Sequence, residues 1–351
     1  MSSEVNINNY IPLPDPIKIT EHQWPSDIKP LVSIRTMAYN HENYIRECLE
    51  GVLMQKTTFP VEFLIHDDAS TDNTAAIIKE YEKRYPNVIK AYYQTENSYS
   101  KNPKEKRRLR QNFFLMFKGK YIALCEGDDY WIDPLKLQKQ VSFLEENDEY
   151  GLVHTKAKVF NQTTGKMLDD VIGDPNNTYF DFLMKNRIAT VTVVLRNSLI
   201  KEYRKEVKPG NMNWKMGDYP LWIWISRRSK IMFLPDSTVV RRLVKGSVSN
   251  QQDREKQIEF LRSTIQIKKY FISKYSCTEE KLKAIKEKIA IDKIKAAVIN
   301  QSYDLYTEGI REKKKLNSDI TMFERMYGVI LRSPILTNIL VFILKYRKRA
   351  L

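Results

Sequence analysis

The chain has 351 residues, 42% of them hydrophobic and 29% charged, which predicts a globular protein with one large domain or two ordinary ones. Its three cysteines, Cys48, Cys125 and Cys277, are odd in number and lack metal-type spacing, which argues against a disulfide framework and favours a reducing compartment, the cytoplasm. The net charge of +15 indicates a polyanionic partner, whether phosphates, an anionic membrane surface or nucleic acid.

The first 30 residues are polar, rich in proline and unpatterned, so they predict an extended lead-in without a signal peptide. A strand-like run, 31–37, then leads into the polar turn 38–43. An amphipathic helix follows, with Ile45, Cys48, Leu49 and Val52 on its apolar face.

A second apolar run, 61–66, ends in the acidic turn 67–72, where Ser70 or Thr71 is expected to cap a helix. Ile77, Ile78 and Tyr81 share one face of that helix. Three further elements are expected before residue 126: a strand at 88–93, a basic helix at about 104–118 and a strand at 121–125.

Strands that alternate with helices predict a mostly parallel sheet flanked by helices, and ligands of such sheets bind beyond the carboxyl ends of the strands. Three turns fall at that edge: Tyr39-Asn40, Asp67-Asp68 and the turn 126–129. We expect them to converge on one site.

The turn 126–129 reads Glu-Gly-Asp-Asp and brings three carboxylates to the end of a buried strand. So few oxygen ligands suit Mg²⁺ or Mn²⁺ shared with the phosphates of a substrate. The alternative is an ordinary acidic turn after a strand, which the second acidic turn at 67–72 makes less attractive. No Gly-rich dinucleotide or phosphate loop and no common hydrolase motif is present, so this acidic site is the candidate for chemistry.

The second half has a mixed pattern, with strands expected at 152–160, 189–196 and 231–244. From Gln251 onward the spacing of apolar residues predicts helices.

Three segments, 32–40, 66–72 and 119–129, resemble the successive motifs of family 2 glycosyltransferases in order and spacing. The resemblance covers 31–244 and implies a GT-A fold, inverting transfer from a nucleoside-diphosphate sugar, with a UDP-sugar favoured, and Mn²⁺ or Mg²⁺. It divides the chain into the lead-in 1–30, a catalytic domain 31–250 and a helical C-terminal region 251–351. The catalytic domain has a nucleotide-binding half, 31–130, and an acceptor half, 131–250.

The resemblance implies that Glu126-Gly127-Asp128 is the equivalent of the family's Asp-x-Asp motif and that Asp128 is the metal ligand. Glu126 stands where the family usually has Asp, and Met37 stands where Thr or Ser is common. The resemblance places the donor against Ala38, Tyr39, Asn40, Glu42, Asp67, Asp68, Arg110, Asn112, Glu126, Gly127 and Asp129.

The acceptor hydroxyl must lose a proton as it attacks the sugar, so a carboxylate base is needed. Asp218 is the candidate, because it opens an aromatic helix where family members place their base; Gly217 departs from the usual Glu-Asp pair. The alternative role of Asp218 is a helix N-cap. Trp214 and Tyr219 are candidates for acceptor binding, and core packing is the alternative for such aromatics.

Basic residues are concentrated at 101–110, where they form either a solvated helix face or a groove for phosphates. The segment 241–249 resembles the loop that closes over the diphosphate in the family. The apolar stretch 335–344 is about half the roughly twenty residues that span a bilayer, and the basic segment 345–349 follows. We expect this tail either to lie on an anionic leaflet or to dock on the protein's own core.

The sequence thus predicts a metal-dependent inverting glycosyltransferase of surface polysaccharide synthesis. Its expected partners are a glycan or lipid-linked acceptor and an anionic membrane, and nucleic acid is not expected. Its expected location is the cytoplasm or the inner face of the cell membrane. One alternative is a sugar-nucleotide pyrophosphorylase, although 36–39 lacks the Gly-rich loop expected there. The other is a non-catalytic basic membrane- or nucleic-acid-binding protein with a degenerate site.

Overall fold

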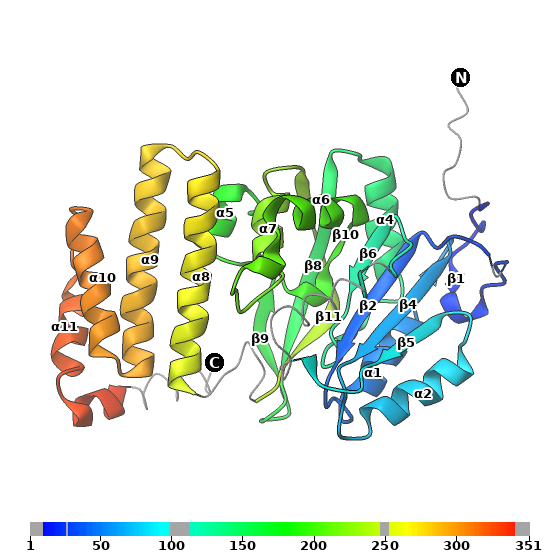
Figure 1. The fold of residues 1–351 in the computed structure, drawn as a ribbon, viewed down its shortest axis with the longest axis horizontal. Helices are drawn as coiled ribbons and strands as arrows, with labels where there is room; N and C mark the ends of the chain where they lie inside the picture. The colour runs from blue at the N-terminus through cyan, green and yellow to red at the C-terminus, as the bar shows by residue number, and fades with distance from the viewer. Residues whose placement is uncertain (1–9, 26, 99–112, 115, 246–252, 341–351) are drawn as a thin grey trace. The chain divides into compact units, whose positions relative to one another are not determined.

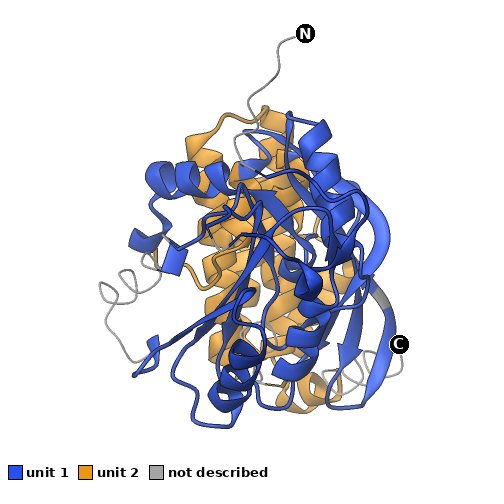
Figure 2. Cartoon of the chain, turned by 90° about the vertical axis from the view of Figure 1, so that its right-hand side faces the viewer, with its two compact units in different colours: residues 1–178, 187–211, 225–244 blue, residues 179–186, 212–224, 245–351 orange. Residues whose placement is uncertain are grey.

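The computed structural model describes residues 10–25, 27–98, 113–114, 116–245 and 253–340 (Figure 1). The chain folds as two compact units, shown in different colours in Figure 2. Unit 1 comprises 1–178, 187–211 and 225–244, and unit 2 comprises 179–186, 212–224 and 245–351. The units are interleaved in sequence, because two short segments from inside the expected catalytic domain 31–250 group with the C-terminal region.

Unit 1 is built on one sheet that has nine strands within the described residues, in the order β5-β4-β2-β6-β10-β8-β11-β7, with β9 paired to β8. The strands are β2 Val32–Ala38, β4 Val61–Asp67, β5 Ile89–Tyr93, β6 Tyr121–Leu124, β7 Tyr130–Trp131, β8 Tyr150–Asn161, β9 Lys166–Ile172, β10 Val194–Arg196 and β11 Lys230–Leu243. Strands β5, β4, β2 and β6 are parallel, whereas β10 runs antiparallel to both β6 and β8. The expected mostly parallel first half and mixed second half are therefore confirmed.

The helices of unit 1 follow the expected apolar spacing. Helix α1, Ile45–Leu53, buries all four residues predicted for its apolar face, and α2, Thr74–Arg84, buries Ile77, Ile78 and Tyr81. The predicted cap of α2 is wrong: the helix begins at Thr74, after Asn73 rather than after Ser70 or Thr71. Helices α4, Lys136–Glu146, and α6, Asn197–Val207, complete the unit's longer helices among the described residues.

The central strands are buried along their length, which explains their continuous apolar runs. All seven residues of β4 and all four of β6 are buried. The expected strand 189–196 is only partly present, because Thr190–Thr192 forms the 3₁₀ helix η3 before β10 begins. The described part of the lead-in is anchored to this unit, since β1, Ile17–Lys18, pairs with β3, Lys56–Thr57.

Unit 2 is helical, as predicted for the C-terminal region. Its main helices are α5 Tyr179–Met184, α7 Tyr219–Ile225, α8 Arg254–Lys274, α9 Glu279–Asn300, α10 Tyr303–Lys315 and α11 Met322–Ile330. Helices α8 to α11 follow one another in a row (Figure 1), held by a small core around Ile294, Ala297, Leu305 and Tyr306. Within the described residues, no helix is both long and apolar enough to cross a membrane.

Candidate active site

Three turns meet at the carboxyl ends of neighbouring strands β4, β2 and β6 in unit 1. Their backbones are hydrogen-bonded to one another: Asp68 N donates to Ala38 O at 2.9 Å, and Gly127 N donates to Met37 O at 3.0 Å. The predicted convergence of these turns is confirmed. The acidic turn itself closes through a bond from Asp129 N to Glu126 O at 3.0 Å.

Gly127 sits in a space that admits no side chain. A Cβ at this position would lie 2.6 Å from Nδ1 of His41 and 3.0 Å from Met37 O. Atoms in proteins pack near van der Waals contact, so any larger residue would displace the His41 ring or the turn. Gly127 therefore lets the acidic turn lie directly on the turn that follows β2.

The three carboxylates of the turn 126–129 lie in different environments. Glu126 forms an ion pair with Arg35 of β2, and Asp129 is buried and accepts a hydrogen bond from Arg242 N at 2.7 Å. Burial, and then the nearby charge of Asp128, raise the pKa of Asp129 well above its usual range. Asp128 is partly exposed, and no described residue donates a hydrogen bond to its carboxylate. Asp128 is thus the carboxylate of this turn that remains available to a ligand.

Arg242, on β11, braces the acidic turn from the other side. Its guanidinium donates to Asp128 O at 2.9 Å and forms an ion pair with Glu47 of α1. The guanidinium also lies over the rings of Tyr130 and Tyr44, at 4.5 and 5.4 Å from their centroids. Sequence reasoning assigned 241–249 to a loop over the diphosphate and missed this brace, because nothing in the local pattern joins Arg242 to a turn more than a hundred residues earlier.

His41 is a second residue of the site that sequence reasoning missed. Its ring lies against Gly127, and its Nδ1 is covered from solvent without a hydrogen-bond partner among the described residues. Burial lowers the pKa of His41, while the carboxylates of Asp128, Asp72 and Asp67 oppose that shift. The signal that could have found it is its position directly after Asn40, inside the first of the three turns.

Several residues that were predicted to bind the nucleotide-sugar donor connect the turns by hydrogen bonds. Asn40 has a left-handed backbone, with φ of 54°, and its Oδ1 accepts a hydrogen bond from Thr71 N at 2.8 Å. Asp67 accepts hydrogen bonds from Ser70 Oγ at 2.6 Å and from Ser70 N at 3.2 Å. Glu42 accepts bonds from the backbone and side chain of Asn73. These contacts make the turns after β2 and β4 one hydrogen-bonded structure.

Asp68 and Tyr39 differ in what they offer a ligand. Both carboxylate oxygens of Asp68 are bonded to Ser98, at 2.8 Å from its backbone N and 2.7 Å from its Oγ. The side chain of Ala38 is buried, and its carbonyl is already bonded to Asp68. Tyr39, by contrast, is 41% exposed. Donor contacts at these three positions stay predictions. Those at Arg110 and Asn112 lie outside the described residues, as does the whole basic stretch 101–110.

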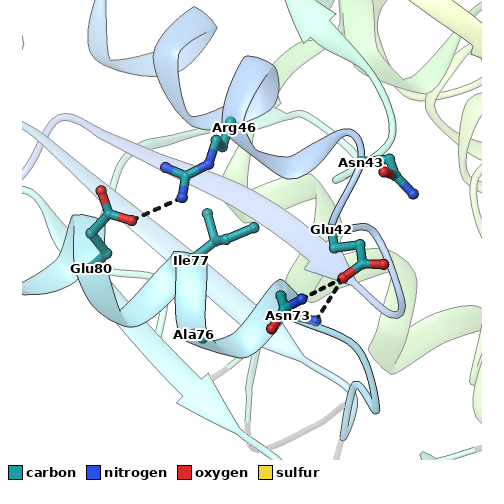
Figure 3. A pocket seen from close by; sticks show the side chains of 7 residues that line it. All are labelled: Glu42, Asn43, Arg46, Asn73, Ala76, Ile77 and Glu80. Carbon is teal, nitrogen blue, oxygen red and sulfur yellow. Dashed lines mark hydrogen bonds and ion pairs between the residues drawn. The ribbon is translucent and has the colours of Figure 1, made fainter.

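A shallow hollow of about 430 Å³ lies beside this region, between α1 and α2 (Figure 3). Its wall carries two polar pairs: Arg46 with Glu80 at 3.0 Å, and Asn73 Nδ2 with Glu42 at 2.9 Å. Glu42 belongs to both the hollow and the first turn, whereas Asp128 does not line the hollow. The hollow is therefore not the ligand cavity of the acidic turn.

The predicted base and acceptor residues lie in unit 2. Asp218 is partly exposed and stands at the start of α7: its carboxylate accepts a hydrogen bond from Tyr219 N at 2.7 Å, and its carbonyl accepts one from Trp222 N at 3.0 Å. Tyr219 is buried, and its hydroxyl donates to Phe182 O at 2.7 Å. Trp214 is half-buried, edge-on to Tyr270. The helix-start position of Asp218 is as expected, while its role as base and the acceptor contacts stay predictions.

Comparison with known proteins finds a matching family model and several relatives. Residues 33–201 match the model of glycosyl transferase family 2. An uncharacterised protein of Mycobacterium tuberculosis is 48% identical over 121 residues, which are 34% of this chain and 32% of that protein. The chain thus matches about a third of the length of that relative. A putative teichuronic acid biosynthesis glycosyltransferase of Bacillus subtilis, TuaG, is 29% identical over 225 residues, which are 64% of this chain and 83% of TuaG.

Solved structures give the fold. The structure of S. aureus TarS in complex with UDP-GlcNAc has a TM-score of 0.51 at 17% identity, and covers 86% of this chain and 79% of that one. A mannosyltransferase from Pyrobaculum calidifontis, in complex with GDP-Man and Mn²⁺, has a TM-score of 0.50 at 13% identity, with 92% and 91% covered. Residues 33–201 therefore form a glycosyl transferase family 2 domain, and the chain has the GT-A fold.

Proposed function

We propose that this protein is a metal-dependent inverting glycosyltransferase that moves a sugar from a nucleoside diphosphate to a hydroxyl of a glycan or lipid-linked glycan. The observation that carries the proposal is the state of Asp128 in a family 2 domain: its carboxylate is partly exposed at the meeting of three turns, while Glu126 and Asp129 beside it are engaged. The family assignment favours transfer over the pyrophosphorylase alternative.

The residues present fit a divalent cation that is shared with the donor. Within the described residues, no cluster of three or more His, Cys, Asp or Glu side chains could hold a metal by itself. Mg²⁺ and Mn²⁺ bind well through one or two carboxylates together with substrate phosphates, so Asp128 can supply the protein ligand and the diphosphate the others. When bound, the cation supplies positive charge where the leaving diphosphate becomes negative.

In the proposed reaction, the acceptor oxygen forms a bond to the anomeric carbon of the sugar while the bond from that carbon to the diphosphate oxygen breaks. The proton of the acceptor hydroxyl passes to the carboxylate of Asp218. Asp128 holds the diphosphate of the nucleotide-sugar donor through the shared cation. Arg242 and Gly127 fix the backbone that carries Asp128.

The named relatives support a nucleotide-sugar donor and a surface glycan acceptor. TarS was solved with UDP-GlcNAc and the Pyrobaculum enzyme with GDP-Man and Mn²⁺, while TuaG is named for teichuronic acid biosynthesis. We propose a UDP-sugar as the donor and a growing surface polysaccharide as the acceptor. This reaction would take place in the cytoplasm, at the inner face of the cell membrane.

The proposal is tested by screening nucleotide sugars for hydrolysis or transfer with Mn²⁺, using the wild-type protein, Asp218→Asn and the control Asp148→Asn. Asp148 has a side chain that is 94% exposed, so its variant should match the wild type. Loss of a general base typically slows turnover by about a hundredfold or more, and we expect that for Asp218→Asn with unchanged donor binding. Near-wild-type turnover of Asp218→Asn would show that another group is the base. Failure of every donor would favour the non-catalytic alternative.

A further inference from the structure

Helix α11 contacts α10 through a buried ion pair and a glycine, in addition to apolar packing. The carboxylate of Glu324 accepts hydrogen bonds from Lys313 Nζ at 3.0 and 2.8 Å, and both side chains are buried. Gly328 lies so close to Tyr306 that a Cβ there would be 2.3 Å from its hydroxyl. The side of α11 that faces its own unit therefore holds this ion pair and glycine beside Tyr327 and the C-cap residue Leu331, which pack on the core of the unit.

Four large apolar residues of α11 face outward. Met322, Phe323, Met326 and Val329 are 75, 62, 41 and 64% exposed. At 3.6 residues per turn, these four side chains occupy one continuous side of the helix. A helix with its apolar side exposed indicates a partner that covers it.

The exposed surface continues past α11. Residues 334–340 are helical, and the next apolar residues, Ile335, Leu336 and Ile339, are 73, 47 and 52% exposed. Half of the fourteen large apolar side chains that are exposed in the described part of the chain lie between 322 and 339. We name the following residues the apolar face: Met322, Phe323, Met326, Val329, Ile335, Leu336 and Ile339.

The charge around the apolar face selects the kind of partner. Residues 311–351 contain ten Lys and Arg against three Asp and Glu. Among the described ones, Arg311, Lys314, Lys315, Arg325 and Arg332 are exposed. An exposed apolar side flanked by cations on a helix too short to span a bilayer is the pattern of a helix that lies in the interface of an anionic membrane.

We propose that the apolar face docks the protein onto an anionic lipid bilayer, with α11 lying in the plane of the interface. The proposal goes beyond the expectation for the tail 335–344, because it places the lipid contact on α11 within the packed row of helices. It stands on unit 2 alone and does not depend on the transfer reaction.

The test measures co-sedimentation of the full chain with vesicles of phosphatidylcholine mixed with phosphatidylglycerol, and with vesicles of phosphatidylcholine alone. Phe323→Gln/Val329→Gln removes apolar contact from the face. Met167→Gln/Val171→Gln is the matched control, because these two exposed apolar residues lie on β9 of unit 1. Since all four side chains are exposed, neither double variant should alter the thermal transition measured by circular dichroism.

We expect the wild-type protein and the control to bind the anionic vesicles, to bind the neutral vesicles weakly, and to lose binding as salt rises. Phe323→Gln/Val329→Gln should bind about tenfold more weakly or worse, since burial of each side chain in lipid is lost.

Three results would overturn the proposal. The first is equal binding by the two double variants, or no binding by the wild type. The second is a wild-type dimer in light scattering that Phe323→Gln/Val329→Gln converts to a monomer without any vesicle binding, which would mean that a second copy covers the face. The third is binding that survives in Phe323→Gln/Val329→Gln but is lost in Phe342→Gln/Leu344→Gln, which would assign the lipid contact to 341–351.

Discussion

Replacing Arg242 with methionine should destabilise unit 1 and disturb the acidic turn, because this guanidinium is almost completely buried. Its side chain is 3% exposed, and it donates to Asp128 O at 2.9 Å while lying 4.5 Å from the ring centroid of Tyr130. Methionine keeps much of the aliphatic volume and removes the charge and the donors. The variant therefore isolates the polar contacts of the brace.

The magnitude follows from the contacts that are lost. A hydrogen bond from a charged donor contributes about 1.5–3 kcal/mol, and a desolvated cation–π contact about 1–2 kcal/mol. The ion pair with Glu47 adds about 1 kcal/mol or less, because the Glu47 side chain is 56% exposed. These contributions overlap, so we expect Arg242→Met to lower the free energy of unfolding by about 2–4 kcal/mol.

The assay is urea unfolding followed by tryptophan fluorescence, with Arg46→Met as the control. Arg46 also pairs with a glutamate, Glu80, at 3.0 Å and lies over a tyrosine, but its side chain is 52% exposed, so its loss should destabilise the protein much less than the loss of Arg242. At temperatures where the variant is folded, Arg242→Met should also weaken metal-dependent nucleotide binding, since the peptide of Asp128 loses its brace. Equal unfolding free energies for the two variants would refute this reasoning.

Two further predictions concern packing and pH. Gly127→Ala should lower the free energy of unfolding by about 1–3 kcal/mol and impair donor binding, because its Cβ would lie 2.6 Å from His41 Nδ1. The control Gly217→Ala should be nearly neutral, because no atom lies within 4 Å of its Cβ. Equal urea midpoints for the two variants would contradict this prediction. Burial lowers the pKa of His154 to about 4, so this residue binds a proton below about pH 6.5 in the unfolded chain but only below about pH 4 in the folded protein. The free energy of unfolding should therefore fall as the pH drops from about 6.5 to 4, and this fall should be about 3 kcal/mol smaller in His154→Gln than in the wild type. Parallel pH profiles for the two proteins would show that His154 does not titrate this way.

The first strands of the sheet and their parallel arrangement could be predicted from the sequence, because β4 and β6 are buried throughout. The apolar run beginning at Val61 became β4, and the run beginning at Tyr121 became β6. Parallel strands with both faces covered leave little ambiguity in such runs. The position of the three turns at one edge follows directly from that topology.

Local pattern failed where a distant partner decided the structure. Ser70 is a good N-cap residue by type, yet its hydroxyl bonds Asp67 and the backbone of Asn40, thirty residues earlier, and α2 begins after Asn73. The run 189–196 reads as a strand, yet Gln140 of α4 binds Thr192 O at 2.9 Å, within the 3₁₀ helix η3. Tertiary hydrogen bonds overrode propensity at both places.

The candidate site shows the same division. The grouping of carboxylates at 126–129 was evident from the sequence, but their separate environments were not. Asp129 is engaged because Arg242 N donates to it from β11, and Asp128 is available because no described residue binds its carboxylate. His41 and Arg242 enter the site only through the fold, so spacing alone could not assign them.

The availability of Asp128 to a metal-bound diphosphate is the claim on which the account depends. Isothermal titration of UDP into the wild-type protein and into Asp128→Asn, each with and without Mn²⁺, measures it directly. We expect the wild type to bind UDP much more tightly with Mn²⁺, and Asp128→Asn to bind with the same weak affinity in both conditions. Metal-dependent binding by Asp128→Asn as tight as that of the wild type would contradict the account.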